Sequence, residues 1–148
     1  MSAGAPDRRW LEENVRLAIA QLGPLSGLDF GLDRESLRYV EGFLERQRER
    51  PGFDPDAAGG LIGVVGAFLG ACVAEATGGE WHWSEERGAW CVRLPNGALA
   101  FPFAKVNKLA RQGLAAGESI VSFYDIAVKY LATGALSEAA RRDGTGAP

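Results

Sequence analysis

The sequence predicts a single α+β domain in which a small three-stranded antiparallel sheet packs against about five helices, one of them central and glycine-rich. Three observations predict this fold class. Apolar residues recur at helical spacing in several segments, residues 57–77 form an apolar run full of glycine, and residues 81–101 form short apolar runs separated by turn residues. The 148 residues suit one domain, and residues 1–6 and 137–148 are expected to be flexible ends.

Capping and stop signals predict the first two helices. Asp7 can cap a helix that Gly23-Pro24 would end, and residues 25–32 would then form a loop. Asp33 can cap a second helix that runs to about Arg50. The buried stripe of this second helix would consist of Leu37, Val40 and Leu44.

The third predicted helix spans residues 57–77, begins after Asp54-Pro55 and ends at Gly78-Gly79. Its first eighteen residues, 57–74, are uncharged, but they are too short and too rich in small residues to favour a membrane span. Four glycines fall on one face: Gly59, Gly63, Gly66 and Gly70. We expect another helix or the sheet to pack closely there, and the alternative is a ligand or a second subunit against that face.

Three strands are expected at residues 81–84, 89–94 and 98–101, with Asn96-Gly97 as a two-residue hairpin turn. That turn would place Leu94 opposite Leu99. One face would then be apolar: Trp81, Trp83, Trp90, Val92, Leu94, Leu99 and Phe101. The other would carry His82, Ser84, Cys91, Arg93, Ala98 and Ala100. The tryptophans are interpreted as core, and the alternative is a ligand platform. Trp81, at the start of the first strand, is expected to be at most partly exposed at the sheet edge.

Two further helices are predicted after the hairpin. Pro102 begins one that runs to about Gln112, and residues 119–132 form the last. Three basic residues recur at intervals of three along the first of these helices: Lys105, Lys108 and Arg111. They are interpreted as a solvated face, or else as a small patch for an anion or an acidic partner.

Composition limits the possible partners. A net charge of −3 and a pI near 5.2 argue against nucleic acid as the main partner. Cys72 and Cys91 do not form a disulfide framework in a chain of this length, so reduced thiols are expected. The N-terminal residues carry no secretion signal, and a cytoplasmic location is expected. One histidine and two distant cysteines do not make a structural zinc site, and no cofactor is expected.

The face with His82, Cys91 and Arg93 is the place where catalysis is conceivable. A histidine beside a cysteine can activate a thiolate. The sequence marks no third orienting group and no oxyanion site, so a polar sheet face without catalytic function is favoured.

Part of the sequence resembles a group of small bacterial proteins whose domain has no assigned function. The resemblance covers residues 61–130 and rests on four motifs: Gly63-x-x-Gly66-x-x-x-Gly70, Gly78-Gly79-x-Trp81, Leu94-x-Asn96-Gly97, and Phe101-Pro102-x-x-Lys105-Val106-x-Lys108, followed by Ser119 to Tyr124. It implies a bacterial source and an α+β fold, and it assigns no catalytic residues.

Together these patterns favour a non-enzymatic bacterial module that binds or regulates another protein. The alternative is a small enzyme or ligand-binding protein that uses the polar sheet face around His82, Cys91 and Arg93. A homodimer that assembles through the glycine face or the sheet edge is a further hypothesis. The ligand or partner candidates are His82, Cys91, Arg93, Lys105, Lys108, Arg111 and Trp81.

Overall fold

The computed structural model describes residues 7–133, so the ends that we expected to be flexible lie outside the described residues. The chain forms, in order, α1 (Arg9–Ser26), α2 (Arg34–Arg48), the 3-10 turn η1 (Pro55–Ala57), α3 (Gly59–Thr77), β1 (Glu80–Ser84), β2 (Ala89–Arg93), β3 (Leu99–Ala100), α4 (Pro102–Gln112), the 3-10 turn η2 (Leu114–Ala116) and α5 (Ile120–Thr133). Five helices and an antiparallel sheet in the order β1-β2-β3 confirm the predicted α+β class.

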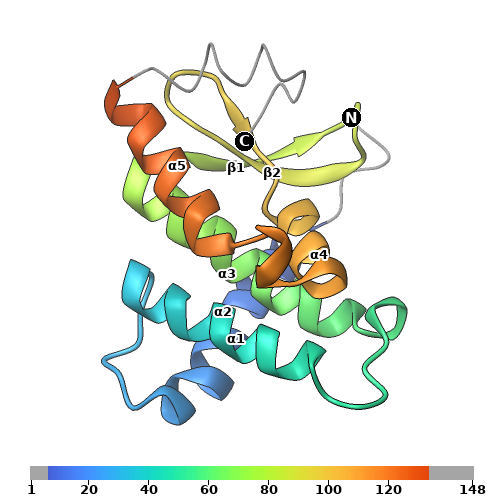
Figure 1. The fold of residues 1–148 in the computed structure, drawn as a ribbon. Coiled ribbons are helices and arrows are strands. Elements are labelled where there is room, and N and C mark those ends of the chain that lie inside the picture. The colour runs from blue at the N-terminus through green and yellow to red at the C-terminus, as the bar shows by residue number, and fades with distance from the viewer. Residues whose placement is uncertain (1–6, 134–148) are drawn as a thin grey trace.

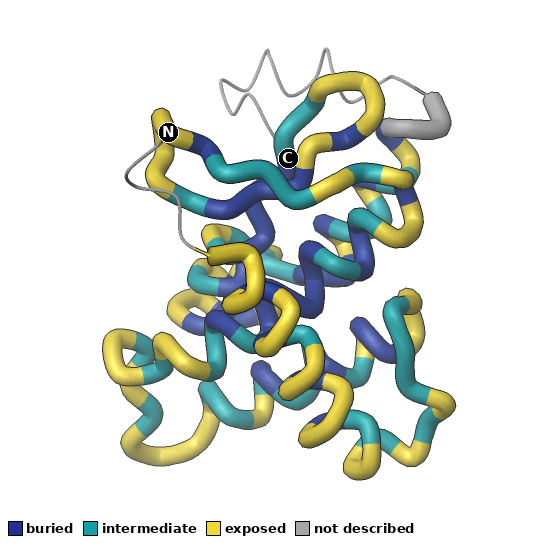
Figure 2. The backbone as a smooth tube through the Cα atoms, turned by 180° about the vertical axis from the view of Figure 1, so that it is seen from behind, coloured by how far each residue is buried: buried dark blue, intermediate teal, exposed yellow. Residues whose placement is uncertain are grey.

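Helix α3 is the centre of the fold. It runs between α1 and α2 on one side and the sheet on the other, with α4 and α5 beside it (Figure 1). It packs against all four other helices and against β1 and β2. Buried residues accordingly concentrate along α3 and the segments packed on it, whereas exposed residues lie in the outer loops and on the outer sides of the surrounding helices (Figure 2). A helix enclosed on this many sides need not be amphipathic, which explains why residues 59–74 carry no charge.

The glycine face of α3 receives aromatic rings from three other elements. A Cβ added at Gly63 would lie 3.2 Å from the Trp10 ring of α1. A Cβ at Gly66 would overlap the Phe103 ring of α4, and one at Gly70 would overlap the Trp81 ring of β1. The expected close approach of a helix and of the sheet to this face is therefore confirmed. Gly59, at the first residue of α3, has open space around it and takes no part.

One helix within residues 7–133, α3, is long and apolar enough to cross a membrane. Half of its most apolar stretch is buried inside the protein (50%). Length and composition do not separate a membrane span from the core helix of a folded domain, and α3 occupies the core position here.

The predicted register of the second hairpin is wrong by one residue. The turn contains Pro95, Asn96 and Gly97, and the backbone N–H of Leu94 donates to the carbonyl of Ala98 at 2.8 Å. A two-residue turn would require an N–H donor at residue 95, and proline has none. The longer turn instead places Gly97 in the left-handed region, at φ 91°, as three-residue hairpin turns prefer.

This shift changes which β3 side chains lie on each face of the sheet. Val92 now pairs with Ala100 and Arg93 with Leu99. Leu99 and Phe101 therefore join the face of Cys91, where Cys91 and Phe101 form a small second core. The predicted apolar face keeps its three tryptophans, Val92 and Leu94 but carries Ala98 and Ala100 in place of the larger residues.

The predicted end of the first helix is also wrong. Helix α1 continues through Gly23-Pro24 to Ser26 and ends where Gly27 adopts a left-handed conformation at φ 70°. Proline in a last turn removes one helical hydrogen bond. Ser26 Oγ donates to the Gly23 carbonyl at 2.7 Å and supports this turn, and the missing side chain of Gly23 lets Phe30 pack against it. The other helix bounds agree with the sequence predictions within two residues.

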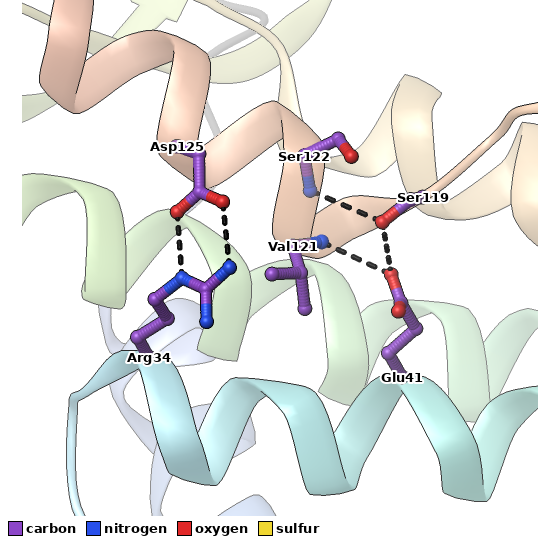
Figure 3. Close-up of polar contacts among 6 residues, drawn as sticks. All are labelled: Arg34, Glu41, Ser119, Val121, Ser122 and Asp125. Carbon is purple, nitrogen blue, oxygen red and sulfur yellow. Dashed lines mark hydrogen bonds and ion pairs between the residues drawn. The ribbon is translucent and has the colours of Figure 1, made fainter.

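Helices α2 and α5 are joined by polar contacts at two points (Figure 3). Arg34 holds Asp125 through two hydrogen bonds of 2.8 Å. Glu41 accepts from Ser119 Oγ at 2.6 Å and from the Val121 backbone N–H at 3.0 Å, at the start of α5. A carboxylate is favoured there because the first N–H groups of a helix lack helical acceptors and carry partial positive charge.

Replacing Gly70 with alanine should destabilise the protein by about 1–3 kcal/mol, because the new methyl group would force the Trp81 ring away from α3. The matched control is Gly60→Ala at the start of the same helix, where nothing lies within 4 Å of the added atom. It should be neutral or stabilising by up to about 1 kcal/mol, because alanine favours helix. Urea unfolding followed by circular dichroism measures both, and equal effects would contradict the packing.

Glu41→Ala should lower the free energy of unfolding by about 1–3 kcal/mol, since two part-buried donors lose their acceptor. Glu41→Gln keeps an acceptor oxygen and should cost less. The exposed Glu13 of α1 provides the control, and Glu13→Ala should change stability by no more than about 0.5 kcal/mol. A Glu41→Ala variant as stable as this control would show that the contact contributes nothing.

Candidate functional site

An aromatic pocket opens beside the sheet and is the main candidate site. It is a cavity of about 380 Å³ lined by Trp10, Trp83, Ala89, Trp90 and Phe103. We call these five residues the aromatic pocket. Its volume lies at the lower end of the range of small-molecule and side-chain sites, roughly 300–1,000 Å³. The lining offers rings and one methyl group, and therefore suits an apolar or planar group.

Four structural elements contribute the rings of this pocket. Trp10 belongs to the first turn of α1, Trp83 to β1, Trp90 to β2 and Phe103 to the first turn of α4. Trp83 and Trp90 are directly paired across the strands, with ring centroids 5.5 Å apart in an edge-to-face arrangement. Trp10 lies 5.5 Å from Phe103. These separations are typical of attractive aromatic pairs, so the pocket walls support one another.

The tryptophan rings that line the pocket differ in how far they are exposed. Trp10 is 45% exposed, whereas Trp90 is 9% exposed. Trp81 shares the sheet face with Trp83 but packs against Gly70 and lies 6.0 Å from Phe103. The tryptophan-rich face is therefore divided: Trp81 packs into the interior, and Trp83 and Trp90 line the cavity. Trp81 is half-buried, in agreement with the expected partial exposure at the sheet edge, while its ring packs against the glycine face of α3.

Sequence reasoning grouped Trp83 with Trp90 but missed Trp10 and Phe103. Strand alternation predicts neighbours within a hairpin, and it says nothing of residues from distant helices. The signal that existed lay in Gly63 and Gly66, which indicated close approach by some group without identifying it.

Arg8 does not line the pocket, but it lies over the ring of Trp90, one of the pocket walls. The guanidinium carbon of Arg8 lies 5.8 Å from the Trp90 ring centroid, and its Nη2 donates to the Trp81 carbonyl at 2.9 Å. The neighbouring Arg9 is paired with Asp7 at 2.8 Å. Among the described residues, Arg8 has no carboxylate within ion-pair distance. Its remaining donors are therefore open to an incoming group.

Trp90 carries a second unsatisfied donor. Within residues 7–133 its indole Nε1 is buried and has no hydrogen-bond acceptor. A buried N–H without an acceptor costs about 1–3 kcal/mol, so such groups are uncommon in folded proteins. It is a polar feature of an otherwise apolar pocket.

The predicted polar face of the sheet does bring His82 and Cys91 together, because the two residues are directly paired across β1 and β2. Cys91 is fully buried, and its Sγ donates to the His82 backbone carbonyl at 3.3 Å. Burial raises the pKa of the Cys91 thiol, which favours the protonated form. Arg93 pairs with Glu80 at 2.9 Å on the exposed edge. The arrangement therefore resembles a packed thiol rather than an activated nucleophile.

The predicted basic patch on α4 is largely engaged in ion pairs. Lys105 contacts Glu118 at 2.8 Å in a part-buried setting, and Arg111 contacts Asp56 at 2.7 Å. Lys108 is exposed. Two of the three candidate cations thus already have carboxylate partners, and these pairs tie α4 to η1 and to the segment between η2 and α5. Within the described part of the chain, no group of three or more His, Cys, Asp or Glu residues could hold a metal ion.

No protein-family model, curated protein or solved structure matches this chain. The resemblance to small bacterial proteins therefore stays a prediction from the sequence motifs.

Neither thiol should react with iodoacetamide in the native protein at pH 8, and both should react after unfolding. Burial is the reason: it raises the pKa of Cys72 to about 12 and raises that of Cys91 as well. Both groups therefore stay protonated and covered at this pH. Mass spectrometry of the labelled protein measures the outcome, with an unfolded sample as the control. Rapid labelling of Cys91 at neutral pH, slowed by His82→Ala, would instead indicate an activated thiolate.

Proposed function

We propose that this protein is a non-enzymatic bacterial module of the cytoplasm that binds another protein by holding one of its apolar or aromatic side chains in the aromatic pocket. The observation that carries the proposal is the 380 Å³ cavity with three tryptophans and a phenylalanine in its walls. Tryptophan is enriched at the centres of protein interfaces, where anchor side chains fill desolvated pockets. The acidic composition and the two free thiols support the cytoplasmic part of the proposal.

The size of the pocket supports a single anchor group. A cavity of about 380 Å³ has room for one large aromatic side chain. The partially exposed Trp10 extends the apolar surface to the outside of α1, where a partner surface can pack around the anchor. Rings that are braced against each other and against α3 lose little freedom on binding, which favours affinity.

The alternative function, an enzyme or ligand-binding protein on the polar sheet face, has less support. Its candidate nucleophile Cys91 is buried, and the raised pKa of its thiol favours the protonated form. The thiol is also hydrogen-bonded to the His82 backbone carbonyl. Arg93 on the same face already has Glu80 as its partner. His82, Cys91 and Arg93 are not among the residues that line the aromatic pocket.

The proposal predicts that a partner captured from a lysate of the source organism is lost when the pocket is altered. Trp83→Ala removes one pocket wall and should reduce capture at least about tenfold, as expected for a central aromatic contact. Leu25→Ala is the matched control, because Leu25 is 65% exposed on α1 and lies outside the pocket. Quantitative mass spectrometry of the bound fraction compares the wild type with both variants.

The binding-module proposal fails if the wild type captures no partner, or if Trp83→Ala captures it as well as the wild type does. Circular dichroism and thermal unfolding must first show that the variant is folded. Capture of a second copy of the same chain, with the same dependence on Trp83, would identify a homodimer as the physiological complex.

A further inference from the structure

We propose that the aromatic pocket recognises an aromatic group that carries a carboxylate a few bonds away, with Arg8 as the partner of that carboxylate. This inference rests on the proposed function, because it names the chemistry of the group that the pocket holds. A chain-terminal aromatic residue and a free aromatic acid share this chemistry.

The arginines near the pocket differ in whether they have a carboxylate partner. Two carboxylates in this region each have their own arginine: Asp7 pairs with Arg9 at 2.8 Å, and Glu80 pairs with Arg93 at 2.9 Å. Arg8 is the third arginine, and among the described residues it has no carboxylate in ion-pair contact. A guanidinium has five N–H donors, of which the Trp81 carbonyl engages one nitrogen. A carboxylate is the group that matches the remaining donors best.

The Arg8 guanidinium is held next to a wall of the pocket. Its hydrogen bond to the Trp81 carbonyl ties the guanidinium to β1, and its carbon lies 5.8 Å from the centroid of the Trp90 ring, a wall of the pocket. Because the cavity and the guanidinium both adjoin Trp90, a ligand that reaches both needs its ring and its carboxylate close together. A phenyl ring with a two-carbon spacer has this form.

The same charge argues against the competing chemistry. Aromatic walls also attract ammonium groups, so a cationic ligand must be considered for any pocket of this kind. Here Arg8 already lies over Trp90, and a second cation in the same place would be repelled. The aromatic pocket is thus better suited to an anion beside an apolar group than to an ammonium ion.

Titration calorimetry on the full chain tests the proposal with three small probes of similar size. These are 3-phenylpropionate, the neutral 3-phenylpropionamide and the cationic 3-phenylpropylamine. The acid should bind roughly tenfold more tightly than the amide, as expected for a charge-assisted hydrogen bond at a part-exposed site, and the amine should bind most weakly. Added salt should weaken binding of the acid and leave that of the amide unchanged.

Matched arginine variants assign the preference to one residue. Arg8→Gln should abolish the preference for acid over amide while the amide still binds. Arg8→Lys should keep part of it, because a cation remains. Arg9→Gln is the control: the same substitution on the next residue, whose guanidinium already has Asp7, should leave the preference intact. Trp83→Ala should weaken all the probes.

Peptides distinguish the two sources of the chemistry. An acetylated Ala-Ala-Ala-Phe peptide with a free carboxylate is compared with its amidated form and with 3-phenylpropionate. A peptide acid that binds more tightly than 3-phenylpropionate supports a protein C-terminus as the ligand. Equal or tighter binding of 3-phenylpropionate would identify a free aromatic acid as the ligand and would contradict the proposed protein partner.

Several results would overturn the inference. Equal binding of acid and amide, tightest binding of the amine, or a preference that survives Arg8→Gln would each remove the role of Arg8, while pocket binding itself would stand. If no probe binds and lysate capture still depends on Trp83, the carboxylate chemistry fails and the proposed function stands. If capture also fails, the proposed function falls with it.

Discussion

Contact between aromatic rings and the glycine backbone of α3 is the constraint on which the rest of the structure depends. Trp10, Phe103 and Trp81 lie against Gly63, Gly66 and Gly70 of one helix face. Each internal glycine costs roughly 1 kcal/mol of helix propensity, which burial of the rings offsets. Because the rings come from α1, α4 and β1, this single face fixes where two helices and the sheet sit around the core.

The aromatic pocket is a direct consequence of that packing. Trp10 and Phe103 serve both as packing residues on α3 and as pocket walls, and Trp83 and Trp90 add the sheet side. A site built on the core inherits the rigidity of the core, since any movement of its walls would open contacts on α3. The polar contacts between α2 and α5 join other elements and leave the pocket residues untouched (Figure 3).

The two faces of the sheet differ in whether their arginines have carboxylate partners. On the Cys91 face, the thiol is buried beside Phe101, and Arg93 is neutralised by Glu80, so that face is packed and charge-balanced. On the tryptophan face, Arg8 lies over Trp90 without a carboxylate among the described residues. The recognition that we propose therefore uses the sheet face that strand alternation alone predicts to be ordinary core.

The sequence by itself determined those features that local physics sets. The cap at Asp33, the left-handed glycine after α3 and the glycine face were all predictable, because capping, glycine conformation and helical spacing act over a few neighbouring residues. The hairpin register was open to local reasoning too, but Pro95 removed the donor that the expected turn needed. Only the tertiary structure decided that Trp10 and Phe103 join Trp83 and Trp90, and that Arg8 lies beside them. Those residues are far apart in the chain, and their meeting depends on how whole helices pack, which no local pattern encodes.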